Sequence, residues 1–303
     1  MKRYAFRVVV ALTSNSRGGN PGSKHVFTGK LVKSLLIDGN PRLKPFFEKT
    51  MGSAPKLVHV SPLYVEKVED GRLRVKCLHT VEHALSFNRH VFYVGFAETE
   101  TGVSPSLDDV YEALLNLSGR HRFASWFFNA ELVSAELVDV EKEADKAVEH
   151  LVKSGKIRVV FASPTLLRDP FRAGKYKSLV PTVMNIFSTP VYVNLYTEGR
   201  LSWRNYVKTL LVIHRLLSEP YSVHSTTRVV HVKYEENKKP TPALIGYVNL
   251  YLNKHYHDHY TTRGVNPQHL LREAFATMLT LGTGTSRATG FGHTTITSPS
   301  GIS

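Results

Sequence analysis

Four glycines near the end of the chain, Gly282, Gly284, Gly290 and Gly292, form the pattern G-x-G-x5-G-x-G around one cation, Arg287. A glycine-rich loop lets backbone N–H groups approach an anion closely, and an arginine adds a charge that suits phosphate. The pattern lacks the Gly-Lys-Ser/Thr end of a P-loop, and it follows a predicted helix, the reverse of a dinucleotide fingerprint. It therefore indicates close approach of the backbone to a polyanion or to another part of the protein.

A second cluster of side chains that could bind a metal ion or take part in catalysis consists of His255, His257 and His259, with Asp258 between them. On a strand the three histidines would project on one side and could hold zinc or manganese, whereas on a helix only His255 and His259 would pair. A polar loop, or stacking of His and Tyr on RNA, are the competing interpretations. We expect no metal and no other cofactor.

Charge and cysteine content narrow the class of protein. The chain has a net charge of +14, of which residues 1–60 carry +9 and residues 221–303 carry +4. Basic ends around a neutral middle predict a polyanionic partner that touches both ends. The single cysteine, Cys77, excludes an internal disulfide framework and a cysteine-built zinc site, and it favours a cytoplasmic location. No apolar run reaches the roughly 18 residues that a membrane span needs.

The elements that must position these residues repeat one pattern. In the first half we expect strands over 4–12, 56–65, 72–78, 90–97 and 124–140, and helices over 28–37, 41–51 and 105–117, the last capped by Ser104 or Asp108. A helical linker over 142–154 precedes strands over 157–162, 227–234, 243–252 and 292–297, and helices over 178–187, 202–217 and 267–281. Each half is β-α-β-β-α-β, which predicts an α+β fold of tandem ferredoxin-like (RRM-like) units, 1–145 and 155–303, with antiparallel sheets facing a basic cleft.

The glycine pattern resembles the C-terminal loop of the RAMP superfamily of CRISPR-associated proteins, and more narrowly the endoribonucleases that process CRISPR repeat RNA. Other segments agree in their order along the chain: Asn40-Pro41-Arg42-Leu43, Pro55-Lys56-Leu57, the run from Phe161 to Arg168, and the strand that Gly246 interrupts. The resemblance implies metal-independent cleavage by the ribose 2′-hydroxyl, which leaves a 2′,3′-cyclic phosphate and a 5′-hydroxyl. It also implies RNA contacts at a set of basic and glycine residues: Arg17, Lys24, Lys30, Arg168, Gly282, Gly284, Arg287, Gly290 and Gly292.

The catalytic residues are less directly implied, because many relatives carry a histidine where this chain has Phe47 and Glu48. Three substitutes are His25 before the first helix, Lys33 on that helix, and Lys56 at the Pro-Lys-Leu step. Some members of the family manage with lysines and arginines alone. A lysine near other cations in a desolvated cleft can have a lowered pKa and act as a base, or it can stabilise the phosphorane as a cation.

The sequence thus predicts an endoribonuclease that cleaves CRISPR repeat transcripts into guide RNAs, with the repeat RNA as its partner. One alternative is a catalytically inactive repeat-RNA-binding subunit of a CRISPR effector complex, which would make other subunits partners as well. A second alternative is a metal-dependent nuclease built on the three histidines. A homodimer is compatible with the sequence, and no membrane partner is expected.

Overall fold

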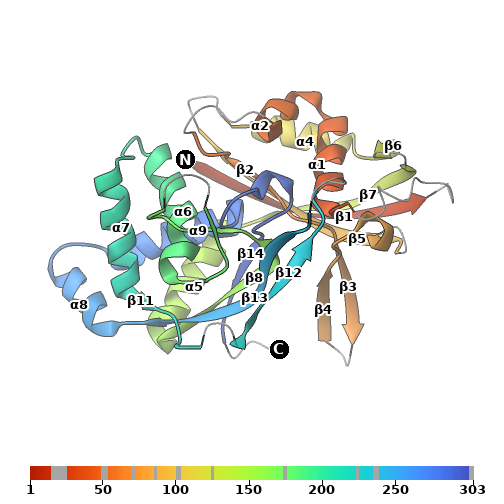
Figure 1. The fold of residues 1–303 in the computed structure, drawn as a ribbon. Helices are drawn as coiled ribbons and strands as arrows, with labels where there is room; N and C mark the ends of the chain where they lie inside the picture. Colours follow the sequence, from red (N-terminus) through yellow and green to blue (C-terminus); the bar gives the residue numbers. More distant parts are fainter. Residues whose placement is uncertain are drawn as a thin grey trace.

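The protein was analysed as a computed structural model, which describes residues 1–14, 26–48, 54–69, 72–84, 87–99, 104–123, 126–172, 176–222, 225–234 and 239–299. Its elements fall into two successive units that share one strand order (Figure 1). Two of the sequence-predicted site residues that precede the first helix, Lys24 and His25, lie outside the described residues, as does Arg17.

The first unit is built on a mixed set of strands and short helices. Its elements are β1 (Lys2–Ser14), α1 (Thr28–Gly39), the 3-10 turn η2 (Pro41–Leu43), α2 (Lys44–Glu48), β2 (Val58–Val60), β3 (Tyr64–Glu69), β4 (Arg72–Cys77), α3 (Val81–Ala84), β5 (Arg89–Glu98), α4 (Leu107–Leu115), β6 (Gly119–Phe123) and β7 (Trp126–Val138). Strand β1 pairs with β5 and β7, and β2 adds to the far edge of β5, so the order is β7-β1-β5-β2, all antiparallel. This is the strand order of a ferredoxin-like sheet.

The second unit repeats this arrangement. Its elements are α5 (Val140–Ser154), β8 (Lys156–Thr165), β9 (Leu167–Arg168), β10 (Lys177–Ser178), α6 (Val183–Thr197), α7 (Trp203–Leu216), β11 (Leu217–Ser218), β12 (Thr227–Val232), β13 (Thr241–Leu252), α8 (Lys254–Thr262), α9 (Pro267–Leu281), the 3-10 turn η4 (Arg287–Thr289) and β14 (Thr294–Thr297). The sheet order is β14-β8-β13-β12, again antiparallel. The tandem ferredoxin-like fold that the sequence predicted is therefore confirmed.

Each unit has its own hydrophobic core, which explains why both patterns could be recognised in the sequence. In β1 the alternate residues Phe6, Val8 and Val10 are buried in the first core together with α1 and α4. The second core contains the apolar stripe of α5, including Val148 and Leu151, so this helix packs with the second unit instead of acting as a free linker. Its ends are well defined, because Asp139 caps the beginning and Gly155 ends it in the left-handed conformation.

The second face of the first sheet is covered in part by a helix of the second unit. Helix α9 packs on β1 and β5, and a Cβ atom on Gly95 would collide with the carbonyl oxygen of Thr280. Glycine at this position therefore lets the helix lie directly on the strand. Helix α9 also contacts β14 of the second sheet, so it lies at the junction of the two units.

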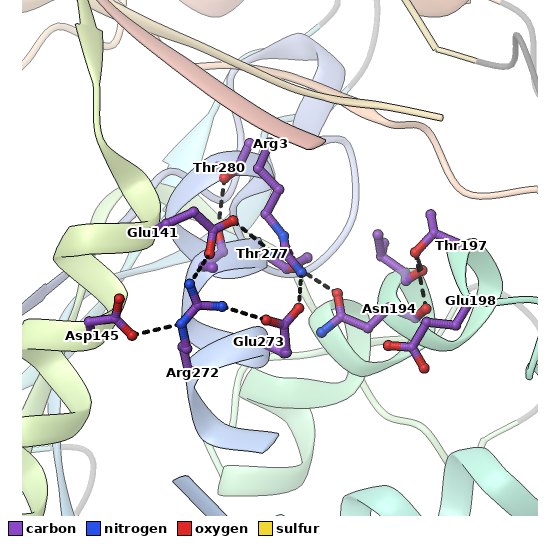
Figure 2. Close-up of polar contacts among 12 residues, drawn as sticks. Arg3, Glu141, Asp145, Asn194, Thr197, Glu198, Arg272, Glu273, Thr277 and Thr280 are labelled. Carbon is purple, nitrogen blue, oxygen red and sulfur yellow. Dashed lines mark hydrogen bonds and ion pairs between the residues drawn. The ribbon is translucent and has the colours of Figure 1, made fainter. Parts of the chain in front are cut away.

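A polar network fastens this junction (Figure 2). The Arg3 side chain, which is only 5% exposed, leaves β1 and forms ion pairs with Glu141 of α5 at 2.9 Å and with Glu273 of α9 at 2.6 Å. Arg272 connects the same two helices through Glu141 at 3.0 Å and Asp145 at 2.6 Å. The junction is thus specified by charge as well as by packing.

Several details differ from the sequence-based expectation. Helix α4 is capped by Ser106 rather than Ser104 or Asp108, because Ser106 and Asp109 form a reciprocal capping box. Strand β6, a hairpin partner of β7, and helix α8 were not predicted. Within the described residues, no helix combines the length and apolar character that crossing a membrane requires.

Candidate nucleic-acid interface

A pocket of about 430 Å³ lies where residues of the two units meet. Helix α1 supplies one wall, α2 and the end of β6 supply others, and the second unit contributes a residue after β12 and one from η4. The lining residues are Lys30, Lys33, Ser34, Ile37, Lys44, Glu48, Phe123, Tyr234 and Thr289. We call this the lysine pocket.

The charge of the lysine pocket suits a phosphate backbone. Lys30 and Lys33 are three residues apart on α1 and therefore share a helix face, and Lys44 joins them from α2. Against these three cations stands one carboxylate, Glu48, which forms an ion pair with Lys33 at 3.7 Å. The ammonium group of Lys30 lies 3.9 Å from the ring centre of Tyr234, a cation–π contact that joins the first unit to the second.

Lys56, the residue of the Pro-Lys-Leu step, lies beside this group of charges. Its ammonium donates a hydrogen bond to the carbonyl oxygen of Phe47, at the end of α2. Burial lowers the pKa of Lys56, and the nearby charge of Lys33 lowers it further, while Glu48 opposes the shift. The structure therefore brings together two of the three predicted catalytic residues, Lys33 and Lys56, although they are far apart in sequence.

Phe47 and Glu48 occupy the place where many members of the family that the sequence resembles carry a histidine, and their side chains have different environments. Phe47 is buried in the first core, while Glu48 lines the lysine pocket and pairs with Lys33. A carboxylate at this place can accept a proton or a hydrogen bond, but it also neutralises part of the local positive charge. Sequence analysis had noted Glu48 only as a departure from the family pattern.

The four glycines of the glycine loop are buried and lie against other backbone segments. Gly290 has φ +98°, and a Cβ atom there would lie 2.6 Å from the Cα atom of Gly29 on α1. Only glycine fits such a contact, because the left-handed conformation and the backbone-to-backbone approach both exclude a side chain. Of the two roles that the pattern allowed, close approach to the first unit is the one that the structure bears out.

The other glycines of the loop are also buried, and each lies close to backbone atoms of the protein. Added Cβ atoms would collide with the carbonyl oxygen of Gly292 at Gly282, of Leu166 at Gly284 and of Thr283 at Gly292. The loop therefore packs against its own backbone and against Leu166, the residue between β8 and β9. RNA contacts of these glycines stay predictions.

Arg287 has a different position from the one expected of an RNA-binding cation. It is 7% exposed, and its guanidinium donates to the carbonyl oxygens of Leu281 and Lys56, each at 3.0 Å. Burial lowers its pKa to about 10. Because two of its N–H donors bind main-chain oxygens from both units, Arg287 joins the loop to the segment that precedes β2.

A buried pair of histidines, which sequence reasoning missed, lies next to this arginine. His59 of β2 and His293 before β14 stack with ring centres 5.5 Å apart, and their Nε2 and Nδ1 atoms are 3.3 Å apart. His59 Nδ1 is 3.1 Å from the carbonyl oxygen of Arg287, so Nδ1 must donate there and Nε2 must accept from His293. Burial lowers the pKa of both, that of His293 to about 4, which keeps the pair neutral. The two residues are 234 positions apart, and no local pattern marks them.

The remaining predicted residues are placed away from the lysine pocket or outside the described chain. Arg168 of β9 is half-buried, and its carbonyl accepts a hydrogen bond from Ser188 of α6 at 3.2 Å. Roles for Arg17, Lys24 and His25 stay predictions.

The three histidines of the possible metal cluster lie on helix α8, which separates them. His255 and His259 stack with ring centres 6.4 Å apart, as the helical alternative predicted, whereas His257 contacts Asp258 at 3.1 Å. In the part of the chain that the structure describes, no three His, Cys, Asp or Glu side chains are grouped as a metal site would require. This arrangement gives no support to a metal-dependent nuclease built on these residues.

The topology and the glycine loop define a protein with tandem ferredoxin-like units, and comparison with solved structures makes this class more specific. The Cas6 protein of Thermus thermophilus in a product complex has a TM-score of 0.60 with this chain at 13% identity, and the match covers 97% of this chain and 99% of that one. A second Cas6 product complex has a TM-score of 0.57 at 13% identity, over 98% and 100% of the two chains. A RAMP protein described as binding different RNA substrates has a TM-score of 0.50 at 9% identity, over 97% and 99%.

The chain thus has the fold of the Cas6 and RAMP proteins over nearly its whole length. No family model matches its sequence, and no curated protein matches it either. The resemblance indicated by the motifs is confirmed by the fold, at a level of identity where sequence comparison alone finds nothing.

Proposed function

We propose that the protein is a metal-independent endoribonuclease that cleaves CRISPR repeat transcripts into guide RNAs. The observation that carries the proposal is the position of Lys33 in a cationic pocket shared by both units, with Lys56 beside this pocket at the end of α2. The fold supports the substrate, since structures with the same fold include Cas6 product complexes and an RNA-binding RAMP protein.

The lysine pocket supplies the groups that the reaction needs. The ribose 2′-oxygen attacks the adjacent phosphorus and loses its proton, and the 5′-oxygen leaves and gains one, so a 2′,3′-cyclic phosphate and a 5′-hydroxyl result. Lys56, which lies beside Lys33 at the end of α2, is the residue that we assign to accept the first proton. The charged Lys33 can stabilise the phosphorane and protonate the leaving oxygen.

The other cations of the lysine pocket bind rather than react. We assign Lys30 and Lys44, which line the pocket, to contacts with phosphates of the bound RNA. Because each phosphate contact releases counterions, binding should weaken steeply as salt is raised from about 50 to 200 mM.

A second candidate function is a catalytically inactive repeat-RNA-binding subunit of an effector complex. Glu48 favours it, because a carboxylate stands where relatives have a histidine and is already paired with Lys33. Incubation of the protein with its repeat RNA in EDTA separates the readings. Cleavage with a cyclic-phosphate end supports the proposal, binding without cleavage supports the inactive subunit, and cleavage that only added metal restores supports a metal-dependent nuclease.

A further inference from the structure

Three exposed aromatic side chains lie on the second unit, and none of them lines the lysine pocket. Phe171 and Tyr176 belong to the connection between β9 and β10, and Trp203 is the first residue of α7. These rings are 50%, 47% and 63% exposed, respectively. We call the three residues the aromatic platform. Large rings open to water at one place are typical of a binding surface.

The platform is held in shape by the protein beneath it. The rings of Phe171 and Trp203 meet edge to face, with centres 6.3 Å apart and planes at 84°. Trp203 also contacts Tyr206, at 6.0 Å between ring centres, and the buried Tyr206 donates its hydroxyl hydrogen to the carbonyl oxygen of Ser188. The exposed faces are therefore positioned before any ligand binds, which reduces the entropy lost on binding.

Cations are interleaved with the rings, and they favour one class of ligand. The guanidinium of Arg172 lies 4.4 Å from the ring centre of Tyr176 and forms an ion pair with Asp169 at 3.3 Å. Lys177 and Arg204, which directly follow Tyr176 and Trp203, are also exposed. Flat rings beside cations match the bases and phosphates of a single strand, whereas a purely apolar partner would have no use for the charges.

We propose that the aromatic platform binds single-stranded RNA by stacking, at a place separate from the lysine pocket. Under the proposed function, on which this part rests, the natural ligand is the unpaired RNA that extends from the repeat segment held in the lysine pocket. The expected preference is for unpaired bases without regard to sequence, because every base has a face that can stack.

Tryptophan fluorescence provides a direct test. The chain has two tryptophans, and Trp126 is only 8% exposed, so a ligand that stacks on the platform should quench Trp203 selectively. We expect a short oligoadenylate of about 10 nucleotides to quench the wild-type protein. Measured with a labelled oligonucleotide, Trp203→Ala and Phe171→Ala should each weaken binding about fivefold or more. Leu211→Ala, an exposed apolar change on the same helix, is the matched control and should bind as the wild type does.

The outcomes separate this inference from the proposed function. Unchanged oligoadenylate affinity in both Trp203→Ala and Phe171→Ala overturns the platform. If sedimentation shows instead that Trp203→Ala dissociates a dimer, the surface binds a second copy of the chain and the RNA proposal is wrong. Trp203→Ala should still cleave a minimal repeat RNA without flanks. Quenching by oligoadenylate in a protein that neither binds nor cleaves repeat RNA would leave the platform standing and refute the proposed function.

Discussion

Replacement of Gly29 by alanine should stabilise helix α1 through helix propensity but destabilise its packing, and the change in the free energy of unfolding shows which effect is larger. Gly29 is the second residue of α1, where alanine would ordinarily stabilise a helix by about 1 kcal/mol. In this structure the added Cβ would lie 2.5 Å from both the Cα atom of Gly290 and the carbonyl oxygen of Thr289. Since carbon atoms in contact are normally about 3.5–4.0 Å apart, the glycine loop would have to retreat by about 1 Å.

Both sides of this contact are backbone, so no side-chain rotation can relieve it. Overpacking of this kind costs about 1–3 kcal/mol, and we expect Gly29→Ala to lower the free energy of unfolding by about 2 kcal/mol. Urea denaturation measures this change. Because Thr289 lines the lysine pocket, affinity for repeat RNA should fall as well.

The control is Gly264→Ala, where φ is +73° and an added Cβ meets nothing within 4 Å. That change should cost the strain of a left-handed alanine, about 1–2 kcal/mol, and leave RNA affinity unchanged. If Gly29→Ala is as stable as the wild type or more stable, propensity outweighs the contact, and the assigned packing of the loop against α1 is refuted.

Other predictions concern the junction of the two units and its response to pH. Arg3→Ala removes a buried guanidinium and its two ion pairs, and it should lower the free energy of unfolding by about 2–3 kcal/mol. Arg200→Ala, which removes an exposed ion pair, should change this free energy by less than about 1 kcal/mol. Equal losses of stability for the two variants in urea denaturation would show that the ion pairs of Arg3 do not stabilise the junction more than an exposed pair does. Burial alone would raise the pKa of Glu273, but the hydrogen bond and charge of Arg3 lower it below its usual value, so its stabilisation exists above the unfolded pKa and is lost as pH falls through the folded one. Glu273→Gln should therefore flatten the acid limb of stability against pH, and an unchanged limb would refute this assignment. Burial lowers the pKa of His293 from 6.5 to about 4, so as pH falls the unfolded chain binds a proton on this histidine before the folded protein does. The free energy of unfolding should therefore decrease by up to about 3 kcal/mol as pH falls from about 6.5 to about 4. His293→Asn should remove this pH dependence.

Much of the fold was accessible from the sequence because local patterns determine it. The β-branched run of β1 and the apolar stripes of α1 and α5 are visible in single windows of sequence. Helix α8 was missed because its His, Tyr and Thr residues have weak helix propensity and no buried stripe. The packing of α9 on the first sheet depends on Gly95, and the sequence has no local signal that pairs this glycine with Thr280.

The candidate site was only partly predictable for a related reason. Lys33 and Lys56 could be named from the family pattern, but Tyr234 and Thr289 join their pocket only through contact between the units. Arg287 was expected to contact RNA because an arginine in a glycine-rich loop adds a charge that suits phosphate. Its burial depends on two main-chain oxygens, those of Leu281 and Lys56, which the sequence does not bring together.

Single-turnover cleavage by Lys56→Ala at saturating enzyme shows whether RNA is cleaved at the lysine pocket, beside which Lys56 lies. Loss of a general base typically slows a reaction by about 10²–10⁴-fold, so we expect a drop in that range with repeat-RNA affinity close to that of the wild type. Lys254→Ala, an exposed lysine at the start of α8, is the control and should cleave at the wild-type rate. If Lys56→Ala also cleaves at the wild-type rate, the chemistry takes place elsewhere and the account is contradicted.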